Sequence, residues 1–434
     1  MSLNFQAILI FLVGVSTWIK VRLVGDLYGS DIMLLLICLQ LASPKNTILS
    51  RANSRDVRYI LIAWLLWLLG LIISDLVRGT ESADFIRGWA RVLFFGTDFI
   101  GIVLLVRWDF RNLKSLLYGW ATALLLTGLF PSNEVVANDP WKFAFSTGIS
   151  LLILILATKD FVRLRWRTVN QIGLLFLASG INLLTGLRSM FAIFFIAAFY
   201  SWLKLWLERM PTLRKKLTPI GFVVLSLIGV LVSLEAKNLY VELASSGYLG
   251  EDAKDKYLEQ SRNDLGLFLA GRSEILISSR AIANSPIIGH GSWARDVTLV
   301  SEYIDLLAAA GLPVNEERYY EGTAANEAGL IPTHSYLFGS WVEAGILGAA
   351  FWILALFMCV KALYRILKVN FSACCLVIPF LFLAIWDFLF SPFAGDHRFT
   401  AAVTIYIILW TLHECAPDGR SAQSIKQASQ FDPA

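Results

Sequence analysis

Charged residues are scarce in this chain. Asp, Glu, Lys and Arg make up only 16% of its 434 residues, apolar and aromatic residues make up 57%, and the mean hydropathy is +0.64. A water-soluble domain carries about a quarter charged residues, so this composition excludes a soluble enzyme built around one core. Long apolar runs such as 59–73 and 217–234 instead predict membrane-spanning helices, which need about 20 such residues.

Cysteine is also rare, and its positions exclude a disulfide framework. None of the five cysteines falls in the long polar segment 235–333, and no CxxC pair suggests a metal site. We interpret them as small apolar residues. The first residues lack the basic region and cleavage site of a secretory signal, so we expect 5–19 to be a retained helix. The cysteines are Cys38, Cys359, Cys374, Cys375 and Cys415.

The apolar segments predict an all-α integral membrane protein with about twelve transmembrane helices. Lipid offers no hydrogen-bond partners to the backbone, so every span should be helical. The chain then divides into nine helices in 1–234, a large helical loop subdomain in 235–333, three helices in 334–414 and a polar tail in 415–434. The expected spans are 5–19, 31–43, 59–77, 84–106, 113–130, 141–158, 169–187, 189–207, 217–234, 335–360, 372–390 and 398–413.

The positions of Lys and Arg predict which loops are cytoplasmic. Basic residues concentrate in alternate connections, and cytoplasmic loops carry such an excess. A cytoplasmic N-terminus satisfies this rule, and the same placement explains the basic pI without a nucleic-acid partner. The loop 235–333 then faces outward, and it reverses the bias with 15 acidic against 8 basic residues. Within it, 271–291 predicts an apolar-striped helix that ends at Ser285-Pro286 and a tight Gly289-His290-Gly291 turn.

Cationic and imidazole side chains converge on this outward face from separate segments. Two arginines four residues apart, at 87 and 91, share a helix face, and a third lies in a tight turn at 188. Two more lie on the helix predicted in the loop. Histidine or arginine also stands at the start of the spans 335–360 and 398–413. We expect a site among them. The residues are Arg87, Arg91, Arg188, Arg272, Arg280, His290, His334, Asp396, His397 and Arg398.

Each of these residues also has an ordinary structural interpretation. Interfacial arginines such as Arg87, Arg91 and Arg398 can extend to lipid phosphates, and Arg280 can pair with a loop carboxylate. His334 can cap its helix, and His290 can be a turn residue. Glu343 and Asp387 lie inside apolar spans, where a carboxylate must pair with an arginine or line a wet cavity. Tyr336 can stack on a sugar ring or simply pack.

Together the residues suit a diphosphate whose lipid tail stays in the bilayer. One guanidinium group can bind two phosphate oxygens at once, and a neutral histidine can accept a proton from an attacking hydroxyl. The outer loop contains no DxD, HExxH or other carboxylate-rich metal signature. We therefore expect arginine rather than Mg²⁺ to stabilise charge, and no cofactor.

The motifs that carry these residues resemble a known family. A GR-x-EIL helix, an SP-x-x-GxG turn and HSYL…EAGILG before a membrane helix, over about 271–348, resemble the O-antigen polymerase and O-antigen ligase superfamily. The large loop between spans nine and ten extends the likeness over most of the chain. Arg188 in the TGLRS turn resembles an arginine that this family has at the start of the following helix. In the family that arginine is usually preceded by serine, and here Leu187 takes the place of the serine.

This resemblance implies a metal-independent, inverting glycosyltransferase of the bacterial inner membrane that acts at the periplasmic face. The donor would be an undecaprenyl-diphosphate-linked oligosaccharide, held by Arg188, Arg272 and Arg280, and His334 would orient or deprotonate the acceptor hydroxyl. Arg87, Arg91, Arg398, Tyr336, His290 and Glu343 are further candidates for substrate binding. Family members either polymerise glycan repeat units or transfer glycan to lipid A–core, and a chain-length regulator is a possible partner.

The motifs do not separate polymerisation from ligation. The acidic loop has no basic stripe suited to a phosphorylated lipid A–core, which favours polymerisation. Twelve helices could also form a flippase for lipid-linked sugars. Transporters with two matched halves usually place any large connection between spans six and seven on the cytoplasmic side, whereas here the long loop comes late and is predicted outside. A non-catalytic partner in a polysaccharide export complex is a third hypothesis.

Overall fold

The structure is a computed structural model of an α-helical chain. It describes residues 5–22, 25–41, 55–132, 134–158, 167–226, 241–243, 245–248, 254, 272–312, 314, 319, 328–371, 373–395 and 397–416. The principal helices are α1 (Phe5–Val15), α2 (Gly29–Leu41), α4 (Arg55–Arg78), α5 (Ser82–Val106), α6 (Phe110–Leu129), α8 (Ser146–Ala157), α9 (Arg167–Leu184), α10 (Arg188–Arg209), α18 (Tyr336–Lys368), α19 (Cys374–Phe390) and α20 (His397–Glu414).

Shorter elements connect these helices. A 3₁₀ turn η1 (Ser16–Trp18) and the antiparallel hairpin of β1 (Lys20–Arg22) with β2 (Asp26–Tyr28) join α1 to α2. The remaining short elements are α7 (Glu134–Asn138), the π-helix η3 (Trp141–Phe145), α11 (Pro211–Lys216), α15 (Glu274–Asn284) and α16 (Val297–Ala309). The two strands are a small exception to the predicted all-α architecture.

Apolar helices make this a membrane-embedded protein. Among the described residues, α4, α5, α10 and α18 are long and apolar enough to cross a bilayer, and several shorter helices are equally apolar. Most stretches predicted as spans are helical within a few residues of their predicted ends. The predicted span 217–234 is helical over 219–226, and its remainder lies outside the described residues.

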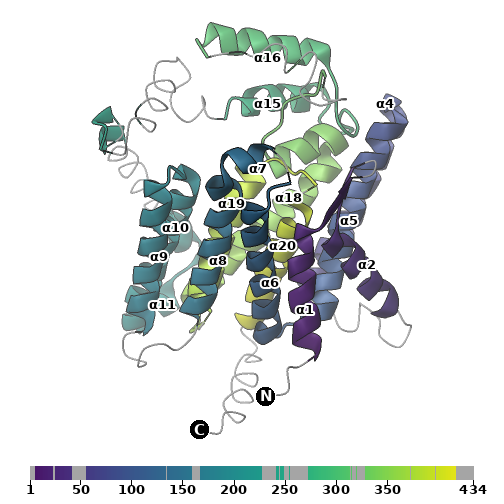
Figure 1. The fold of residues 1–434 in the computed structure, drawn as a ribbon. Coiled ribbons are helices and arrows are strands. Elements are labelled where there is room, and N and C mark those ends of the chain that lie inside the picture. The colour runs from purple at the N-terminus through teal and green to yellow at the C-terminus, as the bar shows by residue number, and fades with distance from the viewer. Residues whose placement is uncertain are drawn as a thin grey trace.

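The two ends of the helix bundle differ. At one end, Trp108 stacks on Tyr406 and His413, which joins the α5–α6 connection to the last turns of α20. At the other end, residues from the connections that follow α1, α6 and α19, together with Met190 near the start of α10, line a cavity. Figure 1 shows α15 and α16 beyond this second end. The residues of these described connections therefore lie at two different ends of the bundle.

Helix α18 is broken near its start. Gly345 has φ 63° and ψ −154°, which interrupts the helix after about two turns. The segment that follows α15 fills the break, because His290 N donates to Val342 O, Gly291 N to Glu343 O, and Ile346 N to Ile287 O. The sequence had predicted one uninterrupted helix over 335–360. The difference arises because the backbone groups freed by the break are satisfied from another segment rather than along the helix.

Helices α15 and α16 contribute to a second, smaller core. Ile277 and Ala281 of α15 pack with Leu299, Tyr303 and Leu307 of α16. Asp296 caps α16 by accepting hydrogen bonds from the N–H groups of residues 298 and 299. The sequence predicted an apolar stripe through Ile275, Leu276 and Ile282, but these are only half-buried and the buried face is centred on Ile277 and Ala281. Helix α15 ends at Ser285 as predicted. Of these two helices, α15 packs on α18, and α16 packs on α15.

Candidate functional site

Arg272 and Arg188 are neighbours in the folded chain although they lie in distant segments. Burial lowers the pKa of the Arg272 guanidinium; Glu274 opposes this effect, and the positive charge of Arg188 adds to it. A like charge has such an influence only at short range. Arg272 precedes α15, Arg188 is the first residue of α10, and the Arg272 guanidinium lies 5.5 Å from the ring centroid of Trp386. Arg188 is therefore near enough to act on the charge of Arg272, and Arg272 itself lies beside the last turns of α19.

His334 is held against the same part of α19. The neighbouring Ser335 caps α18 by accepting from Phe338 N, and its hydroxyl donates to Phe388 O at 2.8 Å. Ser335 is the helix cap, so the capping interpretation of His334 is wrong. The Nδ1 atom of His334 is buried. Ser335 thus fixes the residue next to His334 at the end of α19 that also carries Trp386, the ring beside Arg272.

The turn before Arg188 lacks the serine that the resembled family usually has. Leu187 occupies the N-cap position of α10 and forms no side-chain capping bond. Its own N–H donates to Asn182 O at 2.8 Å, which ties the turn to α9. Arg188 is therefore positioned by the backbone of this turn rather than by a capping hydroxyl.

Arg91 and Glu343 form an ion pair that is largely buried. The pair joins α5 to the broken first part of α18, and Glu343 also accepts from Trp293 N. Arg91 donates a further hydrogen bond to Phe393 O. Its neighbour Arg87 lies within 3.8 Å of Asp84. The prediction that Glu343 pairs with an arginine is confirmed, and this pair locks four segments together at the cavity end.

Arg280 and His290 lie in structural settings. Arg280 is exposed and pairs with Glu302 of α16 at 3.4 Å, which agrees with the loop-carboxylate interpretation. The ring Nε2 of His290 lies 2.8 Å from Ala281 O, inside the turn that fills the α18 break. Tyr336 is buried, and its hydroxyl lies 2.8 Å from His397 Nδ1. None of these three contacts places its residue beside the Arg188–Arg272 pair.

Arg398 forms the most buried ion pair of the site. Its guanidinium contacts Asp31 at 2.5 Å and donates to Asp26 O at 2.9 Å. Asp98 is fully buried close to the same pair. The sequence prediction missed Asp31 and Asp98, although a carboxylate within an apolar stretch is a usable signal.

Asp31→Ala should destabilise the fold strongly, whereas Glu302→Ala should not. Removing Asp31 breaks the buried pair and leaves Asp98 as the nearby carboxyl group, and breaking a buried pair costs up to about 3–5 kcal/mol. The Arg280–Glu302 pair is exposed on both sides, and such pairs contribute about 0–1 kcal/mol. Thermal unfolding of the purified variants measures both. Equal losses would show that the Asp31–Arg398 contact contributes no more than a surface pair.

The cavity at this end of the bundle has a volume of about 600 Å³. Its wall contains charged side chains, hydroxyl groups and aromatic rings from the β1–β2 hairpin, α2, α6, α8, α10, α19 and the α19–α20 connection. The polar and aromatic wall residues include Trp18, Lys20, Asp26, Tyr28, Asp31, Trp120, Thr127, Thr147, Trp293, Asp387 and His397. The prediction that Asp387 lines a cavity is thus confirmed.

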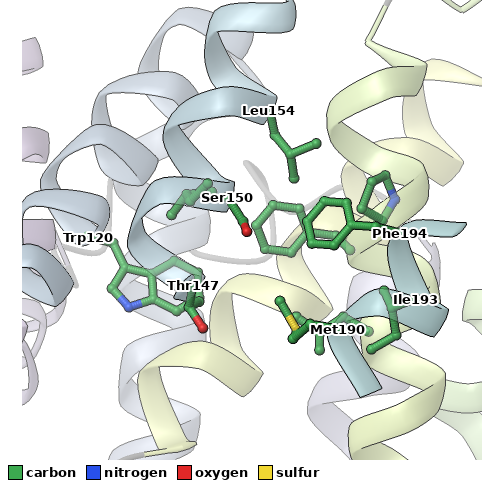
Figure 2. Close-up of a pocket in the computed structure, with 11 residues that line it drawn as sticks. Trp120, Thr147, Ser150, Leu154, Met190, Ile193 and Phe194 are labelled. Atoms are coloured by element: carbon green, nitrogen blue, oxygen red, sulfur yellow. The ribbon is translucent and has the colours of Figure 1, made fainter. Parts of the chain in front are cut away.

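A smaller apolar pocket adjoins this cavity. The two share Trp120, Thr147, Met190 and Leu383 as wall residues. The apolar pocket lies between α6, α8, α10 and α19, and Figure 2 shows Trp120 and Thr147 across it from Ile193 and Phe194. The cavity is therefore polar towards the connections and apolar towards the interior of the bundle.

Trp293 was not predicted from the sequence, and His397 was placed in the expected site without an assigned binding role. Trp293 lies between the guanidiniums of Arg87 and Arg91, each 5.9 Å from its ring, and it lines the cavity. His397 opens α20 and lines the cavity with Asp387. The predicted neighbour Asp396 lies outside the described residues. His397 could have been assigned a role from its place before an apolar span, as His334 was.

No protein family model, curated protein or solved structure matches this chain. Function is therefore argued from the arrangement of its own residues.

Proposed function

We propose that this chain is a multi-pass membrane glycosyltransferase. It transfers a glycan from an undecaprenyl-diphosphate carrier to an acceptor sugar hydroxyl, at the periplasmic face of a bacterial inner membrane. The proposal includes twelve spans with 235–333 outward, because that topology follows from the distribution of basic residues. It also places the cavity end of the bundle towards the periplasm.

The pairing of Arg188 with Arg272 is the observation that carries this proposal. Two guanidinium groups near each other favour binding of an anion that carries more than one charge. A diphosphate fits, because guanidinium groups engage phosphate oxygens through paired hydrogen bonds. The ring of Trp386 beside Arg272 supplies an apolar surface next to the charges. Such a boundary suits a head group whose chain remains in lipid.

His334 supplies the base in the proposed reaction. The acceptor oxygen attacks the anomeric carbon, its proton passes to His334, and the bond from the anomeric carbon to the diphosphate oxygen breaks. The diphosphate leaves with the bonding electrons, and Arg188 and Arg272 compensate its charge. One in-line displacement inverts the anomeric centre. Positioning both reactants in this geometry supplies much of the rate, and the proposal uses no metal ion or cofactor.

The acceptor decides between the two versions of this activity. An acidic outward segment favours a second glycan repeat unit over phosphorylated lipid A–core, because like charges repel. We therefore propose repeat-unit polymerisation, with ligation to lipid A–core as the alternative.

The decisive experiment uses the purified full chain in lipid nanodiscs with lipid-diphosphate-linked repeat units. One reaction contains the repeat units alone, and a second also contains lipid A–core. Gel electrophoresis and mass spectrometry of the products should show a ladder of lengthened glycans in the first reaction. Products only in the second would identify a ligase, and no product in either would contradict the proposed transferase activity.

A further inference from the structure

The cavity of about 600 Å³ contains none of the residues to which the proposed reaction assigns a role. Arg188, Arg272 and His334 do not line it, but Met190 of α10 and Asp387 of α19 belong to its wall. It therefore lies beside the proposed donor site, on the same helix ends. Its volume falls within the range of about 300–1,000 Å³ that small-molecule sites occupy.

Among the charged wall residues of the cavity, Asp387 is the one carboxyl group that is not in an ion pair with a described Lys or Arg. Lys20 pairs with Asp26 at 2.6 Å, and Asp31 pairs with Arg398. Asp387 forms no ion pair with a described residue, and it lines the cavity beside the imidazole of His397. The cavity is therefore poorly suited to a diphosphate and better suited to donors of hydrogen bonds, since an ionised carboxylate only accepts them.

Hydrogen bonds to neighbouring side chains fix the orientation of Asp387 and His397. Ser391 Oγ donates to Asp387 Oδ1 at 2.7 Å. His397 Nδ1 lies 2.8 Å from the hydroxyl of the buried Tyr336. Fixed orientation of this kind reduces the entropy that a bound ligand would otherwise have to overcome. Two polar side chains are thus preorganised on one wall of the cavity.

The remaining wall is typical of a surface that binds sugars. Trp18, Tyr28, Trp120 and Trp293 present rings on several sides. Flat aromatic faces bury the apolar faces of a ring, while hydroxyl groups such as those of Thr127 and Thr147 provide adaptable hydrogen bonds. The combination of rings, hydroxyls and one carboxylate matches the alternating apolar and hydroxyl-bearing faces of a saccharide.

We propose that this cavity is the acceptor subsite, and that it takes saccharides without acid groups, whose hydroxyls are held by Asp387 and His397. The role of the bound saccharide as acceptor rests on the proposed function. Binding of a saccharide in this cavity does not depend on that function. Asp387 sets the preference, because a uronic acid would bring a second negative charge into the same enclosed space.

A thiol-protection experiment tests the proposal without measuring transfer. Thr127→Cys places a thiol on the cavity wall, and Ser82→Cys places one at the exposed start of α5, outside the cavity lining. Each purified variant is treated with a small thiol reagent, with and without saccharide. The probes are neutral hexose and N-acetylhexosamine disaccharides, their uronic-acid counterparts, and polyprenyl phosphate without sugar.

Neutral disaccharides should slow modification of the Thr127→Cys thiol and leave the Ser82→Cys thiol unaffected. The matching uronic acids should need at least a tenfold higher concentration for the same protection. Adding Asp387→Asn should narrow that difference to less than threefold. Failure of every neutral saccharide to protect, protection by sugar-free polyprenyl phosphate instead, or an unchanged preference in the Asp387→Asn protein would each overturn the proposal.

The two proposals can fail separately. Saccharide protection in a protein that transfers no glycan would contradict the transferase activity and leave a carbohydrate site. Transfer by a protein in which neutral saccharides give no protection would retain the activity and exclude this cavity as the acceptor subsite.

Discussion

Arg272→Ala should reduce glycan transfer by at least about 100-fold, because one of two charges that compensate the leaving diphosphate is lost. Removing a single preorganised group that stabilises transition-state charge typically costs about 10²–10³ in rate. Arg272→Lys should restore little of the loss, since an ammonium cannot form the paired contacts of a guanidinium. Arg188→Ala should act similarly, and the double variant should lose less than the product of the two effects, because both groups act on one anion.

His334→Ala should abolish transfer for a different reason. Without the imidazole, the proton of the acceptor hydroxyl has no base, and loss of a general base costs about 10²–10⁴ in rate. Binding of the lipid-diphosphate donor should remain, whereas Arg272→Ala should weaken it. Initial rates from nanodisc reactions and donor binding measured on the same preparations separate these two roles.

Arg111→Ala is the matched control for the arginine variants. Arg111 is exposed at the first turn of α6, at the opposite end of the bundle, so its removal changes the net charge equally. It should transfer glycan at the rate of the native protein. If Arg272→Ala and His334→Ala also gave normal products while folding normally, the assigned roles would be wrong. If Arg111→Ala lost as much as Arg272→Ala, the effect would be one of overall charge.

The helices were predictable because hydrocarbon allows few alternatives. Apolar runs such as 59–77 had to be helical to satisfy their backbone, and α4 covers that range. Interactions between distant segments were less predictable. Asp31 reaches Arg398 only because the start of α2 meets the start of α20, and nothing in the local pattern of either segment specifies that meeting.

Prediction of the site was limited for the same reason. The sequence identified which residues lie at one end of the bundle, and Arg272 with Arg188 follows from that grouping. The sequence could not show which of these cationic residues pair with a carboxylate within the protein and which could bind a substrate. The structure shows that Arg91 and Arg280 each pair with a carboxylate supplied by another helix. Only the fold determines which cations are already neutralised.

Motifs that looked separate in the sequence form one structural unit. The SP-x-x-GxG turn and EAGILG interlock, since the backbone of residues 287–291 bonds the broken turn of α18. Arg78 reinforces the turn by donating to Ser285 Oγ and Gly289 O. The glycines in both motifs are explained by close backbone approach rather than by contact with substrate.

Gly345→Ala should prevent the interlocked fold, with a loss of more than about 3 kcal/mol in the free energy of unfolding or failure to accumulate folded protein. A Cβ atom at this position would overlap the carbonyl of Ile287, and the positive φ of 63° is itself unfavourable for alanine. Neither backbone can retreat, because Ile287 O is the acceptor of Ile346 N. The same break sets the place of Glu343, so the Arg91 pair should be lost with it.

Gly173→Ala provides the contrast that isolates this cause. Gly173 lies in helix α9, and a Cβ atom there would meet nothing within 4 Å. Alanine should stabilise that helix by about 0.5–1 kcal/mol, because it removes the conformational freedom that glycine has in the unfolded chain. Thermal unfolding and size-exclusion profiles of the two variants in detergent should therefore move in opposite directions. A Gly345→Ala protein as stable as the native chain would mean that α18 runs unbroken through this position, and the placement of Glu343 and of the turn at 287–291 would have to be abandoned with it.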